Sequence, residues 1–498
     1  MIFGKLNLRL RAPGAQALAI FLLGLVVRLW LIAAYPALYG GDTVLHLRNH
    51  DRLLLSYQLP GLQLLIYLTY AITAAPIAPR LLMAVLGALA GLGFYLLLTK
   101  LMKQTSAFGA ALFFVVSPFL NELSIVPYQE ILMLGALCFA AYFYLTGQFI
   151  QAGFSLAVAC LTRYEAWIAC PFFAYDYLRS QSYSPKHALK ALFLFGSAPV
   201  FWIAIHAGLS SPGTFVLELP HSVWRLQRWI YVGWITVRNT PIIPLLFAIV
   251  GLFDLWKSRA LAKPEGKLLT CFLSAFAIAL LLSAHGEPHR TSSDPERFVT
   301  SREATLPVTF IFLLAGFGLQ TMLRRAAWQP AVRVCVAAGI LTGILQSASF
   351  VAQQTNRPEV QLSFQLARYF NQNIGAGQTV LLVTKPFAAA DLAFYLRKLE
   401  KRGGTDGLQR AQTNLKSIDL TPPDFQRTAV QCRLSRHQLI ASGDPHQTEW
   451  TAIWSDASPP VEITQEIQNL ERIATVRAGS LFATIYHRQP GIHQVDEF

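Results

Sequence analysis

The chain has 498 residues, of which 54% are hydrophobic and only 14% are charged. An ordinary globular protein carries about 25% charged residues, so this composition and a mean hydropathy of +0.41 exclude a soluble enzyme and a disordered chain. The six cysteines are too few for a disulfide framework. The formal net charge of +14 is interpreted by position, because basic residues in a membrane protein mark its cytoplasmic loops.

Apolar runs predict membrane-spanning helices throughout the first 350 residues, since a span needs about 20 mostly apolar residues. The first run extends from Ala15 to about Leu38 and lacks the small-residue cleavage site of a signal peptide. Further runs bring the predicted number of spans to about eleven. They cover residues 80–101, 106–121, 128–147, 149–163, 165–179, 188–209, 241–257, 267–285, 304–323 and 330–350.

The apolar segment 59–75 determines the side of every later loop. It contains Pro60, Gln63 and several tyrosine and threonine side chains, so it either spans the membrane or lies at its surface as an interfacial or re-entrant segment. Only the second alternative places the basic loop residues in the cytoplasm, as the positive-inside rule requires. We therefore predict a cytoplasmic N-terminus and an extracytoplasmic tail. The basic residues concerned are Lys100, Lys103, Arg179, Lys186, Lys190, Lys257, Arg259, Lys263, Lys267, Arg324, Arg325 and Arg333.

The sequence predicts two domains. Residues 1–350 form a transmembrane domain with outer loops at about 39–59, 210–240 and 286–303, and residues 351–498 form a soluble α/β domain. Helical patterns cover 359–373 and 387–401, a polar loop covers 403–423, and strand patterns cover 379–384, 437–441, 450–454, 471–477 and 481–487.

Two acids stand out in the outer loops. Asp42 follows Gly40-Gly41 at the start of a short amphipathic pattern, where it is either a simple helix N-cap or a functional carboxylate close to the bilayer. Glu130 opens a predicted span. A carboxylate at that depth is costly and usually faces a partner or a cavity.

Basic residues accompany these acids on the same predicted side. Arg163 and Glu165 lie in a tight turn between two spans, where they either simply pair or contact a ligand. Arg80 begins another span, where an anion such as phosphate would satisfy it. The loop 286–303 carries His289, Arg297 and Arg302, and an ordinary solvated loop remains an alternative. The tryptophans of loop 210–240 are typical of an interfacial aromatic belt.

The sequence lacks the motifs that are typical of metal, nucleotide and dinucleotide binding. The chain has no HExxH or CxxC metal motif, no GxxxxGK[ST] phosphate loop and no GxGxxG turn, so we predict no metal and no cofactor. The basic residues are spread over membrane loops rather than gathered in one patch, which argues against nucleic-acid binding.

The order and sidedness of several short motifs resemble those of the GT-C glycosyltransferases. This superfamily contains polytopic enzymes that use dolichyl- or polyprenyl-phosphate sugars, including the mannosyltransferases of family 39 type. The motifs are Arg28 in the first span, Tyr39-Gly-Gly-Asp42, Leu59-Pro60-Gly, Ala78-Pro-Arg80, Ser117-Pro118-Phe-Leu, Pro127-Tyr-Gln-Glu130, Leu161-Thr-Arg163-Tyr-Glu165, and Glu296-Arg297-Phe298 with Pro307.

The resemblance implies an inverting transfer of a sugar, a hexose such as mannose, from a polyprenyl phosphate to an acceptor hydroxyl on the extracytoplasmic face. Asp42 would be the general base and Glu130 a second acid, while Arg80, Arg163, Glu165, His289, Arg297 and Arg302 would bind the lipid phosphate or the sugar. Asp42 is followed by Thr43 rather than by a second acid, which argues against a metal bridged by paired carboxylates. The partners would be the lipid donor, a protein, lipid or glycan acceptor, and the bilayer of the inner or plasma membrane.

Two other function classes remain open. A transporter or flippase would place its polar residues near the bilayer midplane, often in repeated halves, and no repeat is visible here. A non-catalytic scaffold for the outer domain would tolerate the loss of Asp42 or Arg163. The sequence does not identify the sugar, the acceptor or the oligomeric state.

Overall fold

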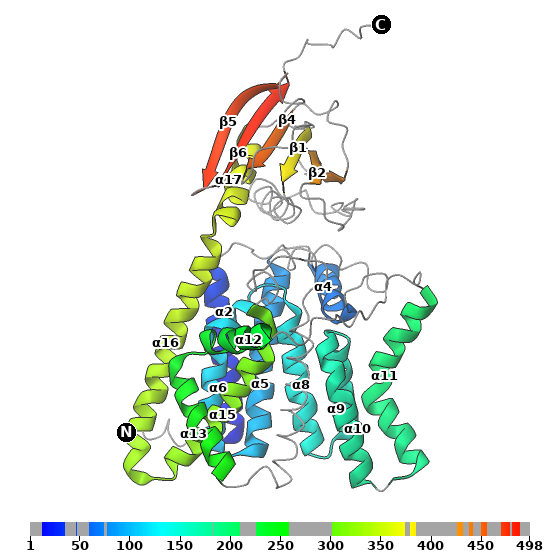
Figure 1. Cartoon of the computed structure of the whole chain (residues 1–498), viewed down its shortest axis with the longest axis vertical. Coiled ribbons are helices and arrows are strands. Elements are labelled where there is room, and N and C mark those ends of the chain that lie inside the picture. The colour runs from blue at the N-terminus through cyan, green and yellow to red at the C-terminus, as the bar shows by residue number, and fades with distance from the viewer. Residues whose placement is uncertain are drawn as a thin grey trace. The chain divides into compact units, whose positions relative to one another are not determined.

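The computed structural model describes two compact units of the chain, a helical unit and a unit with a sheet (Figure 1). Unit 1 comprises Met1–Ala34, Asn49–Ile72 and Ile77–Val351, and unit 2 comprises Tyr35–Arg48, Thr73–Pro76 and Ala352–Phe498. The described residues are 12–34, 46, 59–73, 77–181, 183–209, 226–257, 301–373, 379–384, 426–431, 438–441, 450–455, 470–478 and 481–488.

Apolar helices make up the described part of unit 1 (Figure 1). Helices α2, α5, α11, α15 and α16 are long and apolar enough to cross a membrane. The α-helices are α2 (Pro13–Ala34), α4 (Pro60–Ile72), α5 (Ala78–Leu101), α6 (Gln104–Val115), α7 (Pro118–Leu123), α8 (Gln129–Leu145), α9 (Phe149–Cys160), α10 (Ala169–Ser180), α11 (Pro185–Leu209), α12 (Leu226–Arg238), α13 (Ile242–Lys257), α15 (Thr305–Leu323) and α16 (Gln329–Thr355). Short 3₁₀ turns are η1 (Tyr164–Ile168), η4 (Ser301–Ala304) and η5 (Ala326–Trp328).

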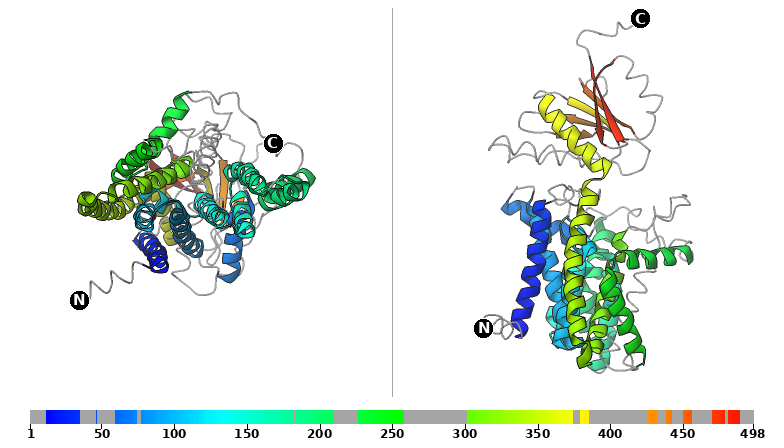
Figure 2. Two further views of the ribbon diagram at one scale, coloured as in Figure 1. Left: turned by 90° about the horizontal axis from the view of Figure 1, so that it is seen from below. Right: turned by 90° about the vertical axis from the view of Figure 1, so that its left-hand side faces the viewer.

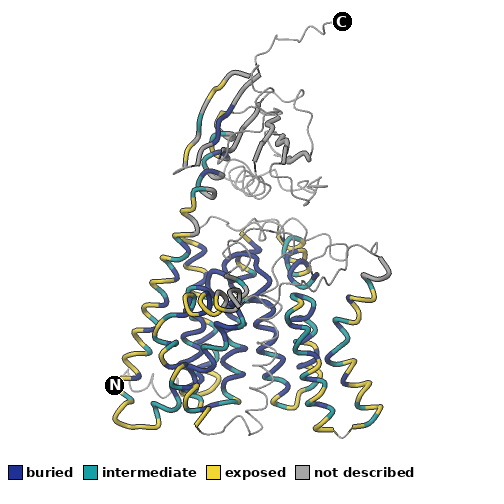
Figure 3. The backbone as a smooth tube through the Cα atoms, viewed as in Figure 1, coloured by how far each residue is buried: buried dark blue, intermediate teal, exposed yellow. Residues whose placement is uncertain are grey.

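Helices α5, α6, α8 and α15 form the centre of the bundle, as the buried stretches in Figure 3 show. In the most apolar segments of α5 and α15, 61% and 56% of the residues are buried. In the corresponding segments of α11 and α16 the share is 22%. The exposed residues of α11 and α16 are mostly apolar. A helix whose exposed surface is apolar is suited to face lipid, so α11 and α16 lie at the outside of the bundle.

Helices α13 and α15 pack at very short range through two glycines. A Cβ atom added at Gly251 would overlap the carbonyl oxygen of Leu314, and one added at Gly318 would overlap that of Phe247. Small residues at a helix crossing allow backbones to approach closely, which is the main source of packing contacts between membrane helices. The close crossing of α13 and α15 therefore fixes the position of α15. Arg302, which belongs to the site described below, lies three residues before this helix begins.

The predicted span 106–121 is wrong in one respect, because the helix breaks at Val116 and Ser117. Pro118 lacks a backbone N–H and disfavours helical geometry at the residue before it, and Ser117 is extended with φ −60° and ψ 124°. The break is buried and is bonded to α16: Ser347 Oγ accepts from Asn121 Nδ2 at 3.0 Å and lies 3.2 Å from the Val116 carbonyl oxygen.

The expected loop 210–240 contains a helix, α12, that lies across the bundle helices (Figures 1 and 2). Ile230, Trp234 and Val237 are exposed on it. An amphipathic helix with an aromatic, apolar outer side is suited to the membrane interface, which agrees with the predicted aromatic belt. Helix α12 packs against η4 and α15.

Helix length bears on which predicted segments can cross the membrane, whereas the number of spans stays open. Helix α4 has 13 residues and helices α9 and α10 have 12 each, about 20 Å or less at 1.5 Å per residue, so each helix alone is shorter than a hydrocarbon core of about 30 Å. The predicted span 267–285 lies outside the described residues, so the total of eleven spans stays a prediction.

Unit 2 contains helix α17 (Pro358–Asn373) and a six-stranded sheet. The strands are β1 (Thr379–Thr384), β2 (Gln426–Gln431), β3 (Gln438–Ala441), β4 (Trp450–Ser455), β5 (Leu470–Ala478) and β6 (Leu481–Arg488), in the order β3-β2-β1-β4-β6-β5. Among the strands that the structure describes, β1 and β4 form the only parallel pair. Helix α17 packs on β5 and β6, with Leu362, Leu366, Ala483 and Ile485 buried. The predicted helix 359–373 and all five predicted strands are confirmed, β2 was missed, and the expected helix 387–401 and loop 403–423 lie outside the described residues.

Candidate functional site

A buried carboxylate, Glu130, lies in the first turn of helix α8 at one end of the bundle. Its side chain is only 2% exposed. One carboxylate oxygen, Oε1, accepts a hydrogen bond from Arg163 Nη1 and lies 3.5 Å from Arg302 Nη1. The other oxygen, Oε2, is buried and has no hydrogen-bond partner among the described residues. A buried polar atom without a partner is costly, so this oxygen is suited to receive a hydroxyl or N–H of a ligand.

Arg163 joins Glu130 to a second carboxylate. It lies between α9 and η1 in extended conformation, with φ −148° and ψ 144°, and its Nε donates to both oxygens of Glu165 at 3.0 and 3.1 Å. The pairing of Arg163 with Glu165, considered from the sequence as a simple alternative, is therefore present. The additional bond to Glu130 goes beyond that alternative, because it connects the α9–η1 turn to the start of α8.

Arg302 reaches the same carboxylate from η4. Its guanidinium lies over the ring of Tyr128, 4.9 Å from the ring centroid. Such a cation–π contact is worth about 0.5–2 kcal/mol, with the higher value where water is excluded. The hydroxyl of Thr305, the first residue of α15, donates to the Arg302 carbonyl at 2.5 Å. Helix α15 thus positions this arginine.

Two further buried arginines support the turn that leads into Glu130. Arg28 of α2 donates from Nε to Ser124 Oγ at 2.6 Å, and Arg80 of α5 donates from Nε to the Ile125 carbonyl at 2.8 Å. Arg28 is fully buried and Arg80 is 3% exposed. These bonds attach α2 and α5 to turn residues Ser124 and Ile125.

Gly61 holds α4 against the α9–η1 turn. Its N–H donates to the Leu161 carbonyl at 2.7 Å, and a Cβ at this position would lie 2.5 Å from Thr162 Oγ1. On the other side, Gln129 Nε2 donates to the Leu59 carbonyl at 3.4 Å. The start of α4 is therefore attached both to the turn before Arg163 and to the residue before Glu130.

The structure brings four of the predicted site residues together: Glu130, Arg163, Glu165 and Arg302. We call them the Glu130 cluster. Arg80 contacts the turn before Glu130 through its Nε. Asp42, His289 and Arg297 lie outside the described residues. No three histidine, cysteine, aspartate or glutamate side chains gather in one place within the described residues.

Sequence reasoning missed three residues of this site. Tyr128 was part of a recognised motif but not expected to hold Arg302, and Ser124 and Gly61 were not considered as positioning residues. The Pro60-Gly61 pair carried a usable signal, because a glycine in the first turn of a helix is unfavourable unless something approaches it closely.

Comparisons with known proteins agree with a membrane fold. No protein-family model and no curated protein sequence matches the chain. The fold is similar to that of ArnT from Cupriavidus metallidurans, solved in the apo state and bound to undecaprenyl phosphate. Both comparisons have a TM-score of 0.60 and cover 95% of this chain and 98% of ArnT, at 12% and 10% identity.

A more distant likeness links the chain to the oligosaccharyltransferase of Archaeoglobus fulgidus, solved with a tethered acceptor peptide. It has a TM-score of 0.43 and 15% identity over 76% of this chain and 59% of that enzyme. At these identities the likeness concerns the fold. The chain is an integral membrane protein with the GT-C fold that its motifs predicted.

Proposed function

We propose that the protein is a membrane glycosyltransferase that moves a sugar from a polyprenyl phosphate to an acceptor hydroxyl. The observation that carries the proposal is the Glu130 cluster, in which a buried carboxylate with one unpartnered oxygen lies between two arginines. The likeness to ArnT over nearly the whole of both chains supports it, because that protein has been solved with undecaprenyl phosphate bound.

The chemistry requires two kinds of group. A general base removes the proton of the acceptor hydroxyl as its oxygen bonds to the anomeric carbon, and the bond from that carbon to the phosphate oxygen breaks. The electron pair leaves on the lipid phosphate, where cations stabilise the developing negative charge. A single displacement of this kind inverts the anomeric carbon.

We assign Arg302 and Arg163 to the lipid phosphate and Glu130 to a hydroxyl of the donor or acceptor. Arg163 is held by two carboxylates, whereas the contact of Arg302 with Glu130 is longer, at 3.5 Å. Arg80, His289 and Arg297 remain further candidates for donor binding, and Glu165 for holding Arg163.

Asp42 is the proposed base, with Glu130 as the second acid. Mannose is the favoured sugar, on the resemblance of Thr162-Arg163-Tyr-Glu165 alone. The acceptor faces the extracytoplasmic side under the positive-inside assignment.

The test is mass spectrometry of polyprenyl-phosphate lipids from a deletion strain complemented with wild type, Asp42→Asn or Glu130→Gln. We expect a glycosylated lipid to accumulate in the deletion strain and only wild type to clear it, which also identifies the sugar. Each substitution keeps the size of the side chain and removes its charge.

Other outcomes would redirect the proposal. Clearance by Asp42→Asn but not by Glu130→Gln would move the base to Glu130. Unchanged lipids, with both variants restoring growth or envelope properties, would contradict a transferase and favour a transporter or a scaffold.

A further inference from the structure

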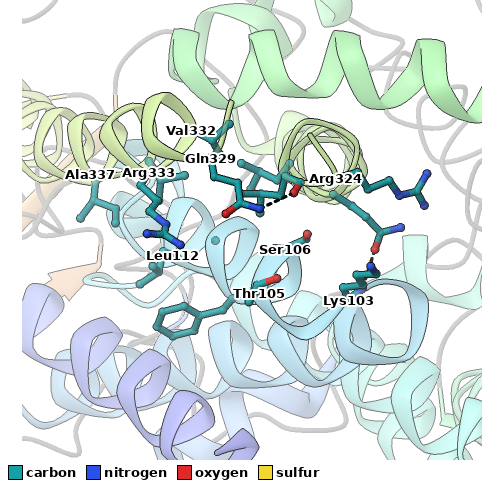
Figure 4. Close-up of a pocket in the computed structure, with 16 residues that line it drawn as sticks. Lys103, Thr105, Ser106, Leu112, Arg324, Gln329, Val332, Arg333 and Ala337 are labelled. Atoms are coloured by element: carbon teal, nitrogen blue, oxygen red, sulfur yellow. Dashed lines mark hydrogen bonds between the residues drawn. The ribbon is translucent and has the colours of Figure 1, made fainter. Parts of the chain in front are cut away.

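A second candidate site lies at the end of the bundle away from the Glu130 cluster. A cavity of about 480 Å³ opens among α6, α15 and α16, as Figure 4 shows. Helix α15 begins three residues after Arg302 and ends at Leu323, which lines this cavity. Its 19 residues rise about 28 Å, close to the thickness of the hydrocarbon core. The cavity and the cluster therefore lie near opposite faces of the membrane.

Three cations line the cavity: Lys103 before α6, Arg324 after α15 and Arg333 in α16. Figure 4 places Arg333 on one side and Lys103 with Arg324 on the other. All three are exposed, and none forms an ion pair with another described residue. No aspartate or glutamate belongs to the lining. The described part of this cavity thus carries positive charge with no acid to balance it.

The rest of the lining changes from polar to apolar along the helices. Thr105, Ser106 and Gln329 lie at the level of the cations, and Leu112, Val336 and Ile340 lie further along α6 and α16. From Gln329 to Ile340, α16 rises about 16 Å at 1.5 Å per residue. The cavity therefore continues from the charged end of the helices towards the bilayer interior with an apolar wall.

We propose that this cavity binds an anionic glycerophospholipid from the membrane leaflet at this end of the bundle. The lipid phosphate lies among the three cations, and an acyl chain follows the apolar wall. A free phosphate compound would use the cations but leave the wall uncovered. A zwitterionic lipid would bring its own ammonium group to a site that holds only cations, so its affinity is lower.

The test uses the full-length protein, purified and stripped of lipid in neutral detergent. Native mass spectrometry follows its titration with phosphatidylglycerol, phosphatidylcholine and, as a soluble competitor, glycerol phosphate. A basic residue near an anionic lipid surface strengthens binding about fivefold. We expect the triple variant Lys103→Gln, Arg324→Gln, Arg333→Gln to bind phosphatidylglycerol at least about tenfold more weakly than wild type.

A matched control separates this site from general attraction to basic loops. Lys190, Lys257 and Arg325 are exposed, are predicted on the same side of the membrane and do not line the cavity. Replacing all three with glutamine gives the same change of charge, and we expect a clearly smaller loss of phosphatidylglycerol binding than in the triple variant, because exposed charges outside the cavity are screened by salt.

A charge-neutral variant tests the apolar part. Ala337→Trp places a large side chain at the cavity lining and keeps all three cations, so it should also weaken phosphatidylglycerol binding. If the triple variant does not fold, Ala337→Trp tests the proposal by itself, and unchanged phosphatidylglycerol binding in this variant would contradict it.

Three results would overturn the proposal: equal weakening in the triple variant and its control, unchanged binding in the triple variant, or displacement of the lipid by glycerol phosphate at equal concentration. The first indicates a general electrostatic effect, and the last indicates a site for a soluble phosphate compound.

Discussion

Arginines lie at both ends of α15, but their surroundings differ. Before its first turn, Arg302 shares the Glu130 carboxylate with Arg163 and covers the ring of Tyr128. After its last turn, Arg324 lies beside a cavity lined with two further cations and no acid. The first end is a largely buried cluster of two arginines and two carboxylates. The second end is exposed, and its charged lining residues are all positive.

This difference predicts different roles for the residues at the two ends of α15. A buried ion pair fixes geometry, and removing one partner leaves an uncompensated charge. Exposed cations contribute little to the free energy of folding. They attract anions, and salt weakens this attraction. We therefore expect substitutions at the first end to change stability and activity, and substitutions at the second to change lipid binding only.

The largest effect is expected for Glu130→Ala. It leaves Arg163 and Arg302 without the carboxylate they share, and breaking a buried pair costs about 3–5 kcal/mol of unfolding free energy. Glu165→Ala is the matched comparison, because that side chain is 19% exposed, so water can replace part of the lost pairing and the loss should be smaller than for Glu130→Ala. Denaturant unfolding in detergent micelles measures both. Equal losses for the two variants would contradict the contrast between a buried and a partly exposed acid.

The second effect tests α15 itself, since this helix links the two ends. Gly318→Ala adds a methyl group that overlaps the Phe247 carbonyl oxygen, and such overpacking costs about 1–3 kcal/mol. The control is Gly14→Ala, where the added carbon meets nothing within 4 Å and helix propensity predicts a neutral or slightly stabilising change. Thermal unfolding of both variants in one detergent gives the comparison. A neutral Gly318→Ala would mean that α13 and α15 are free to separate.

A smaller effect is expected at the ring below Arg302. Tyr128→Leu removes the cation–π contact, which is worth about 0.5–2 kcal/mol, whereas Tyr128→Phe keeps the ring. If Arg302 binds the lipid phosphate, Tyr128→Leu lowers kcat/KM by about two- to thirtyfold, as that energy range implies, and Tyr128→Phe changes it much less. The measurement is initial rates with the lipid donor identified above. Equal effects of the two variants would assign the role to the hydroxyl instead of the ring.

Most of the helical framework could be predicted from the sequence, because apolar runs and charge placement are governed by the bilayer itself. The break at Ser117 was missed although Pro118 marks it, since hydropathy alone does not register a proline. Helix α12 was taken for a loop because its alternating tryptophan and arginine residues were interpreted by composition rather than by helical periodicity.

The candidate site was predictable in its residues but not in its contacts. Glu130 was named because a carboxylate at membrane depth is costly, Arg163 and Glu165 because they lie in a tight turn between two predicted spans, and Arg302 because it lies in a charged outer loop. That Arg163 connects two carboxylates, and that Gly61 and the buried Arg28 hold the surrounding turns, depends on distances between segments far apart in the chain. Spacing within one segment carries no information about those distances.

The smallest effect on folding is expected at the far end of α15. Replacing Lys103, Arg324 and Arg333 with glutamine removes exposed charges that have no acidic partner among the described residues, so the unfolding free energy in lipid-free detergent should change by no more than about 0.5 kcal/mol. Added phosphatidylglycerol should then raise the Tm of wild type and of Glu165→Ala, because a ligand that binds only the folded state stabilises it. It should leave the Tm of the triple variant unchanged. A lipid-dependent rise of equal size in all three proteins would mean that the lipid acts elsewhere, and the contrast between the two ends of α15 would then concern stability alone.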